Sequence, residues 1–154
     1  MIKCQRETML IGLDEVLALA VAHCRELRPD RTFDPDVERL RDLFCDGGFR
    51  VYSARLDGVM IGYAAFTVAK HLLFKSETFA VECGFFIDRA HRGRHILLLL
   101  RFAEADLFVA GVNSIMLSEQ VEHPVSVLFR RLGYRPIESA WIKDQAQQKI
   151  RRAA

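Results

Sequence analysis

The sequence has few of the residues that mark metal sites, disulfide frameworks or membrane spans. Its four cysteines are scattered over 154 residues with no C-x-x-C pair, so the spacing excludes a zinc site and predicts buried free thiols. Apolar runs such as Ile96–Leu100 are far shorter than the ~20 residues that cross a bilayer. The N-terminus, MIKCQRETM, lacks the apolar segment of a signal peptide. We therefore expect no metal, no membrane partner and a cytoplasmic protein.

The sequence also has no large excess of positive or negative charge. The chain has 22 basic and 20 acidic residues, a net charge of +2, which argues against a nucleic-acid-binding α+β domain and a polybasic membrane anchor. In contrast, hydrophobic residues make up 51% of the chain and include 11 phenylalanines, enough for a sizeable core. At this length we expect one domain, residues 1–154, in which residues 144–154 form a solvated C-terminal tail rich in Gln, Lys and Arg.

The most informative stretch, Phe79 to Gly111, predicts a strand, a basic loop and a long apolar helix. The strand, Phe79–Ile87, is rich in aromatic and β-branched residues. The loop, Asp88–His95, places five basic side chains around Gly93, and the helix, Ile96–Ala110, is apolar on almost every side. Free N–H groups at the start of such a helix, with the helix dipole behind them, form an anion site. Phosphate is the ligand to expect there; the alternative is a solvated basic loop ahead of a core helix.

The rest of the chain predicts an α/β fold with a mixed sheet flanked by helices. The Asp57-Gly58 pair is a hairpin signal, so the strands on either side of it are antiparallel. A crossover through the 96–110 helix predicts a parallel pair between the central strand and the next one. The other predicted elements are a short strand at Met1–Cys4, a helix at Asp14–Arg28, a helix capped by Asp34-Pro35 and ended by Gly47-Gly48, strands at Phe49–Leu56, Val59–Ala69 and Ser114–Ser118, a helix from His123-Pro124 through Leu132, and a last strand at Ile137–Lys143.

Two patches resemble motifs of the GNAT superfamily of N-acetyltransferases. Ile87-x-Arg89-x-His91-Arg92-Gly93-Arg94-His95-Ile96 is similar to motif A, V-x-P-x-Y-R-G-K-G-I-G, although His95 and Leu97 stand where the family has glycines. Val125–Tyr134, VSVLFRRLGY, is similar to motif B, A-x-x-L-Y-x-K-L-G-F, with Phe129 in place of the tyrosine. The resemblance covers about Val51 to Trp141. It implies a divergent member with a GNAT-like fold, in which the central strand and the following strand splay apart around the cofactor.

The resemblance also implies an activity and a set of site residues. The activity is direct transfer of an acetyl group from acetyl-CoA to an amine of a small molecule or protein, without a covalent enzyme intermediate. Glu82, the only carboxylate inside the central strand, is the candidate general base, because the amine must be neutral to attack a thioester. In a regular strand, Glu82 would share a face with Gly84 and Phe86. A bulge near Gly84, usual in this fold, would change that arrangement. A homodimer is one expected assembly. The expected cofactor-binding residues are Phe86, Ile87, Arg92, Gly93, Arg94, His95, Ile96, Leu97 and Phe129.

Phe129 leaves two interpretations open. The tyrosine of the family commonly protonates the departing thiolate or holds it by a hydrogen bond, and phenylalanine does neither. Ser118 or Ser126 could substitute, although a serine hydroxyl is a poor acid, and the protein would then be a slow enzyme. The alternative is a catalytically inactive GNAT-like binding or structural protein of viral or mobile-element type. Nothing in the sequence names the acceptor; Tyr52, Tyr63 and Trp141 are candidates for its pocket, with core positions as the alternative.

Overall fold

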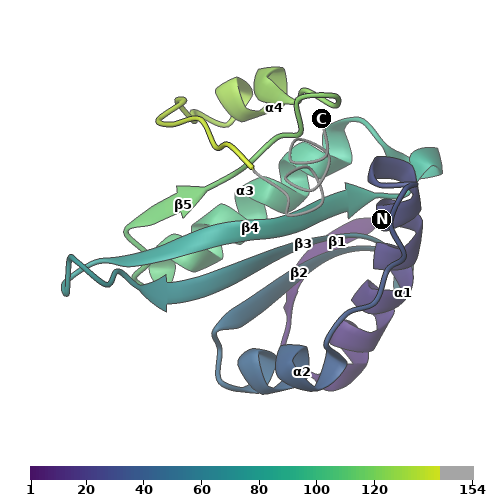
Figure 1. Cartoon of the computed structure of the whole chain (residues 1–154). Coiled ribbons are helices and arrows are strands. Elements are labelled where there is room, and N and C mark those ends of the chain that lie inside the picture. Colours follow the sequence, from purple (N-terminus) through teal and green to yellow (C-terminus); the bar gives the residue numbers. More distant parts are fainter. Residues whose placement is uncertain (143–154) are drawn as a thin grey trace, which may run out of the picture.

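The computed structural model describes residues 1–142 and arranges them as a five-stranded sheet with helices on both faces (Figure 1). The sheet order is β1-β2-β3-β4-β5, and every neighbouring pair is antiparallel except β4 and β5, which are parallel. The predicted mixed sheet, its hairpin and its parallel pair are thus confirmed. The elements are β1 (Ile2–Glu7), α1 (Leu10–Leu27), α2 (Val37–Cys45), β2 (Phe49–Leu56), β3 (Val59–Lys70), β4 (Thr78–Ile87), a 3₁₀ turn (Arg89–His91), α3 (Arg94–Val109), β5 (Ser114–Met116) and α4 (Ser126–Arg131).

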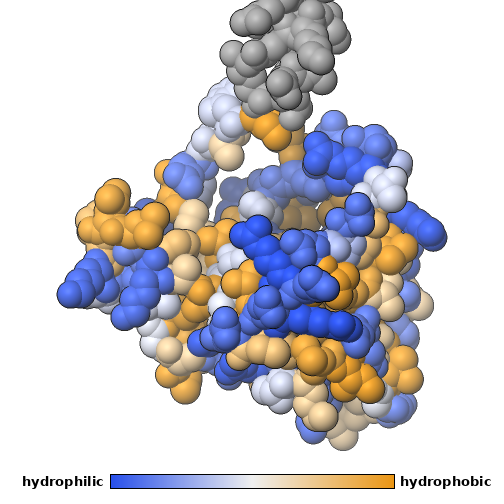
Figure 2. Space-filling model, turned by 60° about the horizontal axis from the view of Figure 1, so that its bottom comes forward, coloured by the Kyte–Doolittle hydropathy of each residue, from blue (hydrophilic) through white to orange (hydrophobic). Residues whose placement is uncertain are grey.

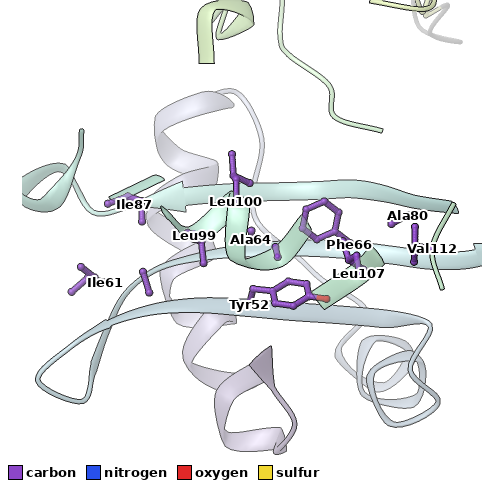
Figure 3. Close-up of a cluster of buried hydrophobic side chains, with 12 residues drawn as sticks. Tyr52, Ile61, Ala64, Phe66, Ala80, Ile87, Leu99, Leu100, Leu107 and Val112 are labelled. Carbon is purple, nitrogen blue, oxygen red and sulfur yellow. The ribbon is translucent and has the colours of Figure 1, made fainter. Parts of the chain in front are cut away.

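Each face of the sheet carries its own apolar core. On one face, α3 buries Leu99, Leu100 and Leu107 against Tyr52 and Phe66 of the sheet (Figure 3). This position explains one apolar face of α3; Leu98, Phe108 and Val109 on its other sides are exposed, so the helix is not buried on most sides as its composition suggests. On the opposite face, α1 and α2 pack against a second cluster; its buried members are Leu13, Val16, Ala20, Phe49, Val51, Met60, Tyr63, Ala65 and Phe86.

A buried carboxylate fixes the start of α1 on the sheet. Glu7, only 8% exposed, accepts hydrogen bonds from Ser53 and Arg55. Arg55 also pairs with Glu15 of α1, so one guanidinium joins the sheet to the helix. A Cβ atom at Gly12 would lie 2.5 Å from a carboxylate oxygen of Glu7, which explains the glycine in the first turn of α1.

Several element boundaries differ from the sequence-based prediction. β1 extends to Glu7 and α1 begins at Leu10 rather than Asp14, because the first turn of α1 packs on the end of β1. In α2 the N-cap is Asp36 rather than Asp34; its side chain accepts from the N–H of Arg39 at 3.1 Å. The next helix, α3, starts two residues early, at Arg94.

The predicted last strand, Ile137–Lys143, is wrong for its described part. Residues 137–142 have no regular structure, and Trp141 is 94% exposed. β5 ends at Met116 instead of Ser118, so its edge offers few backbone groups to a further strand, and β-propensity alone does not form one. The helix predicted from residue 123 is also shorter, Ser126–Arg131. Lys143 and the predicted tail, residues 144–154, lie outside the described residues.

The surface agrees only in part with the expectations from composition. All four cysteines are free, but Cys45 and Cys83 are exposed, so the prediction of buried thiols is wrong for these two. Over residues 1–142, no helix has the length and apolar character needed to cross a bilayer. On the face that Figure 2 turns forward, hydrophilic and hydrophobic residues alternate over short distances.

Candidate active site

The main cleft of the molecule opens where β4 and β5 separate. The two strands pair only from Phe79 to Val81 and from Ser114 to Met116, as expected for strands that splay apart. Beyond these pairs lies a cleft of about 770 Å³. Its walls come from α1, β3, β4, the start of α3 and the segment from residue 118 to 128. One cleft therefore reaches both faces of the sheet.

Glu82 lies at the point where the strands part. The β4 ladder places Glu82 opposite Phe66 and Gly84 opposite Ala65, so Cys83 is the extra residue of a bulge, close to where it was expected. Oε2 of Glu82 accepts hydrogen bonds from the backbone N–H of Ser118 at 3.3 Å and from its hydroxyl at 2.9 Å. Burial raises the pKa of Glu82, and the two hydrogen bonds from Ser118 oppose that rise. A carboxylate with a raised pKa in a cleft suits a general base.

The basic loop leads directly into α3. Asp88 accepts from the N–H of Ala90 at 2.9 Å and opens a short 3₁₀ turn, which the sequence did not predict. Gly93 then has φ +111° and ψ −128°, a conformation that side chains disfavour. No side chain caps α3 and its first turn holds no acidic residue, so its first N–H groups are free to bind an anion.

Two arginines of the loop are paired with α1. Arg92 donates to Glu26 at 2.7 Å, and Arg89 donates to the same carboxylate oxygen at 3.2 Å. Nε of Arg92 also donates to the carbonyl of Ile87, and its guanidinium carbon lies 5.5 Å from the centroid of the Phe86 ring. The hydrogen bond from Arg92 is the main reason why the pKa of Glu26 is lowered. The loop is thereby held against the α1 side of the cleft.

The cleft contains some of the residues expected at the site and not others. Glu82, Phe86, Ile87, Arg92, Gly93 and Ile96 line it, whereas Arg94, His95, Leu97 and Phe129 are not among its lining residues. His95 donates through Nδ1 to the carbonyl of His91 at 2.7 Å. Phe129 packs edge-on against Phe85, with ring centroids 6.0 Å apart, and Leu128 lines the cleft from α4 instead.

A histidine and a tyrosine at the cleft form a pair that the sequence did not predict. Nδ1 of His23 lies 2.7 Å from the hydroxyl oxygen of Tyr63, and the His23 ring stacks on Phe86 at 5.1 Å. Burial lowers the pKa of His23, so the imidazole is neutral near pH 7. Burial, and after it the charge of Glu82, raises the pKa of Tyr63. Helical periodicity places His23 on the apolar face of α1, three residues after Ala20, which was its one signal in the sequence.

The other two acceptor-pocket candidates lie elsewhere. Tyr52 is buried beneath α3 and donates to Asp106 at 2.8 Å. Trp141 is exposed to solvent and is not among the lining residues. In the described part of the chain, no group of three or more His, Cys, Asp or Glu side chains is placed to hold a metal ion.

Comparisons with known proteins agree with this fold. A family model described as the Acetyltransferase (GNAT) family matches residues 13–134. Among solved structures, an aminoglycoside acetyltransferase from an uncultured soil metagenomic sample, in complex with sisomicin, superposes with a TM-score of 0.71 at 15% identity and covers 93% of both chains. A ribosomal-protein-alanine N-acetyltransferase from Brucella melitensis biovar Abortus 2308 gives 0.70 at 14% identity, covering 94% of this chain and 99% of that one.

A third solved structure contains acetyl-CoA. A predicted acetyltransferase with acetyl-CoA from Clostridium acetobutylicum gives a TM-score of 0.69 at 11% identity and covers 96% of this chain and 98% of that one. At these identities the structures show a shared fold. No curated protein matches the sequence.

Proposed function

The chain belongs to the GNAT acetyltransferase family, and on that premise we propose that it is an N-acetyltransferase that moves the acetyl group of acetyl-CoA directly to an amine. The observation that carries this proposal is Glu82: a half-buried carboxylate with a raised pKa, at the point where β4 and β5 part. An acetyl transfer to an amine needs such a base, because the ammonium form has no lone pair with which to attack.

The residues of the cleft fit a coenzyme A ester. The free N–H groups at the start of α3 suit a pyrophosphate, and glycine at position 93 lets a phosphate approach the backbone closely. Arg92, Arg89 and Arg94 add positive charge nearby. A pantetheine arm would pass between β4 and the segment after β5, against Phe85, Ile96 and Leu128. The donor supplies an acetyl group as a reactive thioester.

The side chains of this protein have defined tasks in the transfer. Glu82 accepts the proton of the ammonium group, and Ser118 holds the carboxylate in place. The neutral amine nitrogen forms a bond to the acetyl carbon while the carbon–sulfur bond breaks, and the electron pair leaves with the thiolate. The nitrogen is positively charged after this attack and releases its second proton to water, which leaves a neutral amide. The thiolate takes its proton from water, because Phe129 has none to give and the hydroxyl of Ser118 is engaged with Glu82. We therefore expect a slow enzyme.

A direct transfer assay tests this proposal. The protein is incubated with acetyl-CoA and a panel of small amines and lysine- and N-terminus-bearing peptides, and both free CoA and acetylated product are measured. We expect stoichiometric release of CoA and formation of an N-acetyl product, at a rate about 10²-fold or more lower in Glu82→Gln. Binding of acetyl-CoA without transfer to any acceptor in the panel would contradict it.

An inactive GNAT-like binding or structural protein is the second candidate. Two observations favour it: Phe129 carries no hydroxyl, and both Arg89 and Arg92 already pair with Glu26 rather than standing free for phosphates. Under this alternative neither acetyl-CoA nor free CoA binds, so calorimetry with both separates the two candidates.

A further inference from the structure

The α1 side of the cleft differs in chemistry from the side at which a phosphate would bind. The start of α3 and Leu128 of α4 lie on one face of the sheet, and α1 lies on the other. In a direct transfer the two substrates approach the same carbon from different directions. If the donor occupies the α3 side, as the proposed function requires, the acceptor enters from the α1 side.

The α1 wall is apolar and aromatic. Leu27, Phe33, Tyr63 and Phe86 line it, together with the ring of His23 stacked on Phe86. Tyr63 and Phe86 are also in contact, with ring centroids 6.5 Å apart. Flat apolar groups pack well against such rings, whereas a strongly hydrated group would lose its water there without compensation.

Each of the three carboxylates that line the cleft accepts at least one hydrogen bond from a group of the protein through its Oε2. Glu26 pairs with Arg92 and Arg89, and Glu82 accepts from Ser118. Glu119 accepts from the N–H of Val125 at 2.6 Å. Two cations, Arg28 and Arg92, line the same cleft. On the α1 wall the carboxylate, Glu26, is thus already paired with two arginines, so this wall offers a polycationic acceptor little negative charge for its additional ammonium groups.

The hydroxyl of Tyr63 is a polar group on the α1 side of the cleft that can bind the amine. Among the described residues, its side-chain hydrogen-bond partner is Nδ1 of His23, 2.7 Å away. In the neutral tautomer that carries its proton on Nε2, the hydroxyl donates to Nδ1, and the lone pairs of its oxygen stay available to an N–H donor. Gly84 lies beside this hydroxyl: a Cβ there would be in van der Waals contact with this oxygen at 3.6 Å and with Cε1 of His23 at 3.4 Å, so the glycine keeps that contact surface free for a ligand.

From these contacts we propose that the acceptor is a small primary amine on a flat apolar group, that Tyr63 accepts a hydrogen bond from its nitrogen, and that His23 is a positioning residue that orients the Tyr63 hydroxyl. This inference rests on the proposed function and specifies the acceptor side of the same cleft. Glu82 remains the group that takes the proton.

The test compares two amines and two tyrosine variants. 2-Phenylethylamine is the flat apolar probe and spermidine the polycationic one; kcat and KM are measured for each, and amine binding is measured by calorimetry with free CoA present. Tyr63→Phe removes the hydroxyl and keeps the ring. Tyr52→Phe is the matched control, since its hydroxyl lies under α3 and bonds to Asp106.

We expect 2-phenylethylamine to have the higher kcat/KM. Loss of one hydrogen bond in Tyr63→Phe should raise the KM for it roughly 2- to 12-fold and weaken its calorimetric binding by the same factor, with the dissociation constant of acetyl-CoA unchanged. His23→Gln should change KM in the same direction, and Tyr52→Phe should not change it. A higher kcat/KM for spermidine, or a Tyr63→Phe variant with wild-type KM, would overturn this inference alone. A wild-type protein that binds no acetyl-CoA would overturn the proposed function as well.

Discussion

Replacing Glu82 by Gln removes the proposed base with little change in shape. The amide oxygen of Gln can accept the same two hydrogen bonds from Ser118, at 2.9 and 3.3 Å in the native protein, so the variant keeps the link between β4 and the segment after β5. A positioned general base contributes about 10²- to 10⁴-fold to a rate. At about 1.36 kcal/mol per tenfold, this is about 2.7–5.4 kcal/mol of activation free energy.

We therefore expect kcat/KM for the amine to fall by about 10² or more in Glu82→Gln, with the affinity for acetyl-CoA nearly unchanged. In wild type, activity should fall as the pH drops through the raised pKa of Glu82, above the range of an ordinary glutamate, and the variant should lose this acid limb. Glu119→Gln is the control, because Glu119 lines the same cleft but its carboxylate is bonded to the backbone N–H of Val125.

The same substitution should also change the thermal stability of the protein. The pKa of Glu82 is raised in the folded state, so the stability that this group contributes is fully present below its unfolded pKa and is lost as pH rises through the folded pKa. Gln carries no charge at any pH. Glu82→Gln should therefore melt at a higher temperature than wild type at pH 7, and the difference should vanish near pH 4. A folded Glu82→Gln variant with wild-type turnover at pH 7 would refute the reasoning and place the base elsewhere.

Three further substitutions test other parts of the site and fold. Phe129→Tyr should raise acetyl transfer by about 10²-fold or less or shift its pH profile; an unchanged rate from pH 6 to 9 would show that the hydroxyl does not reach the sulfur. Glu26→Gln releases Arg89 and Arg92 and should tighten CoA binding up to about fivefold by calorimetry, since a partly exposed pair is worth about 1 kcal/mol or less; weaker binding would show that Glu26 holds the arginines in place for the ligand. Gly62→Ala places a Cβ 2.6 Å from the carbonyl of Phe86 and should cost about 1–3 kcal/mol in urea unfolding. Gly48→Ala, with contacts of 3.5 Å or more, is its control, and equal stability of the two variants would contradict the packing argument.

Local signals predicted the strands of the sheet well. The Asp57-Gly58 turn adopts positive φ at both residues, as a type I′ hairpin requires, and it fixes where β2 ends and β3 begins. β4 lies between an antiparallel neighbour, β3, and a parallel one, β5, so its β-branched and aromatic residues pack as the pattern suggests. The segment 137–142 has comparable propensity but no strand beside it in the described structure, and it is irregular.

The residues that line the cleft could be predicted only where they lie close together in one short stretch of the sequence. Glu82, Phe86 and Gly93 fall within a dozen residues, in and just before the stretch that resembles the family motif. His23 and Tyr63 are 40 residues apart, and the contact depends on how α1 packs on β3 and β4. The pairing of Glu26 with the loop arginines also joins distant segments, 63 and 66 residues apart, so neither periodicity nor motif could indicate it.

Calorimetric titration of the protein with acetyl-CoA tests the central claim most directly, because every other step depends on that donor. We predict micromolar binding by wild type, weakened by about 1–3 kcal/mol in Gly93→Asp, which adds negative charge at the start of α3. Gly111→Asp is the matched control: Gly111 also has positive φ and open space around a Cβ, but it lies at the other end of α3. Absence of binding by folded wild type, or equal affinity of Gly93→Asp and Gly111→Asp, would contradict the account.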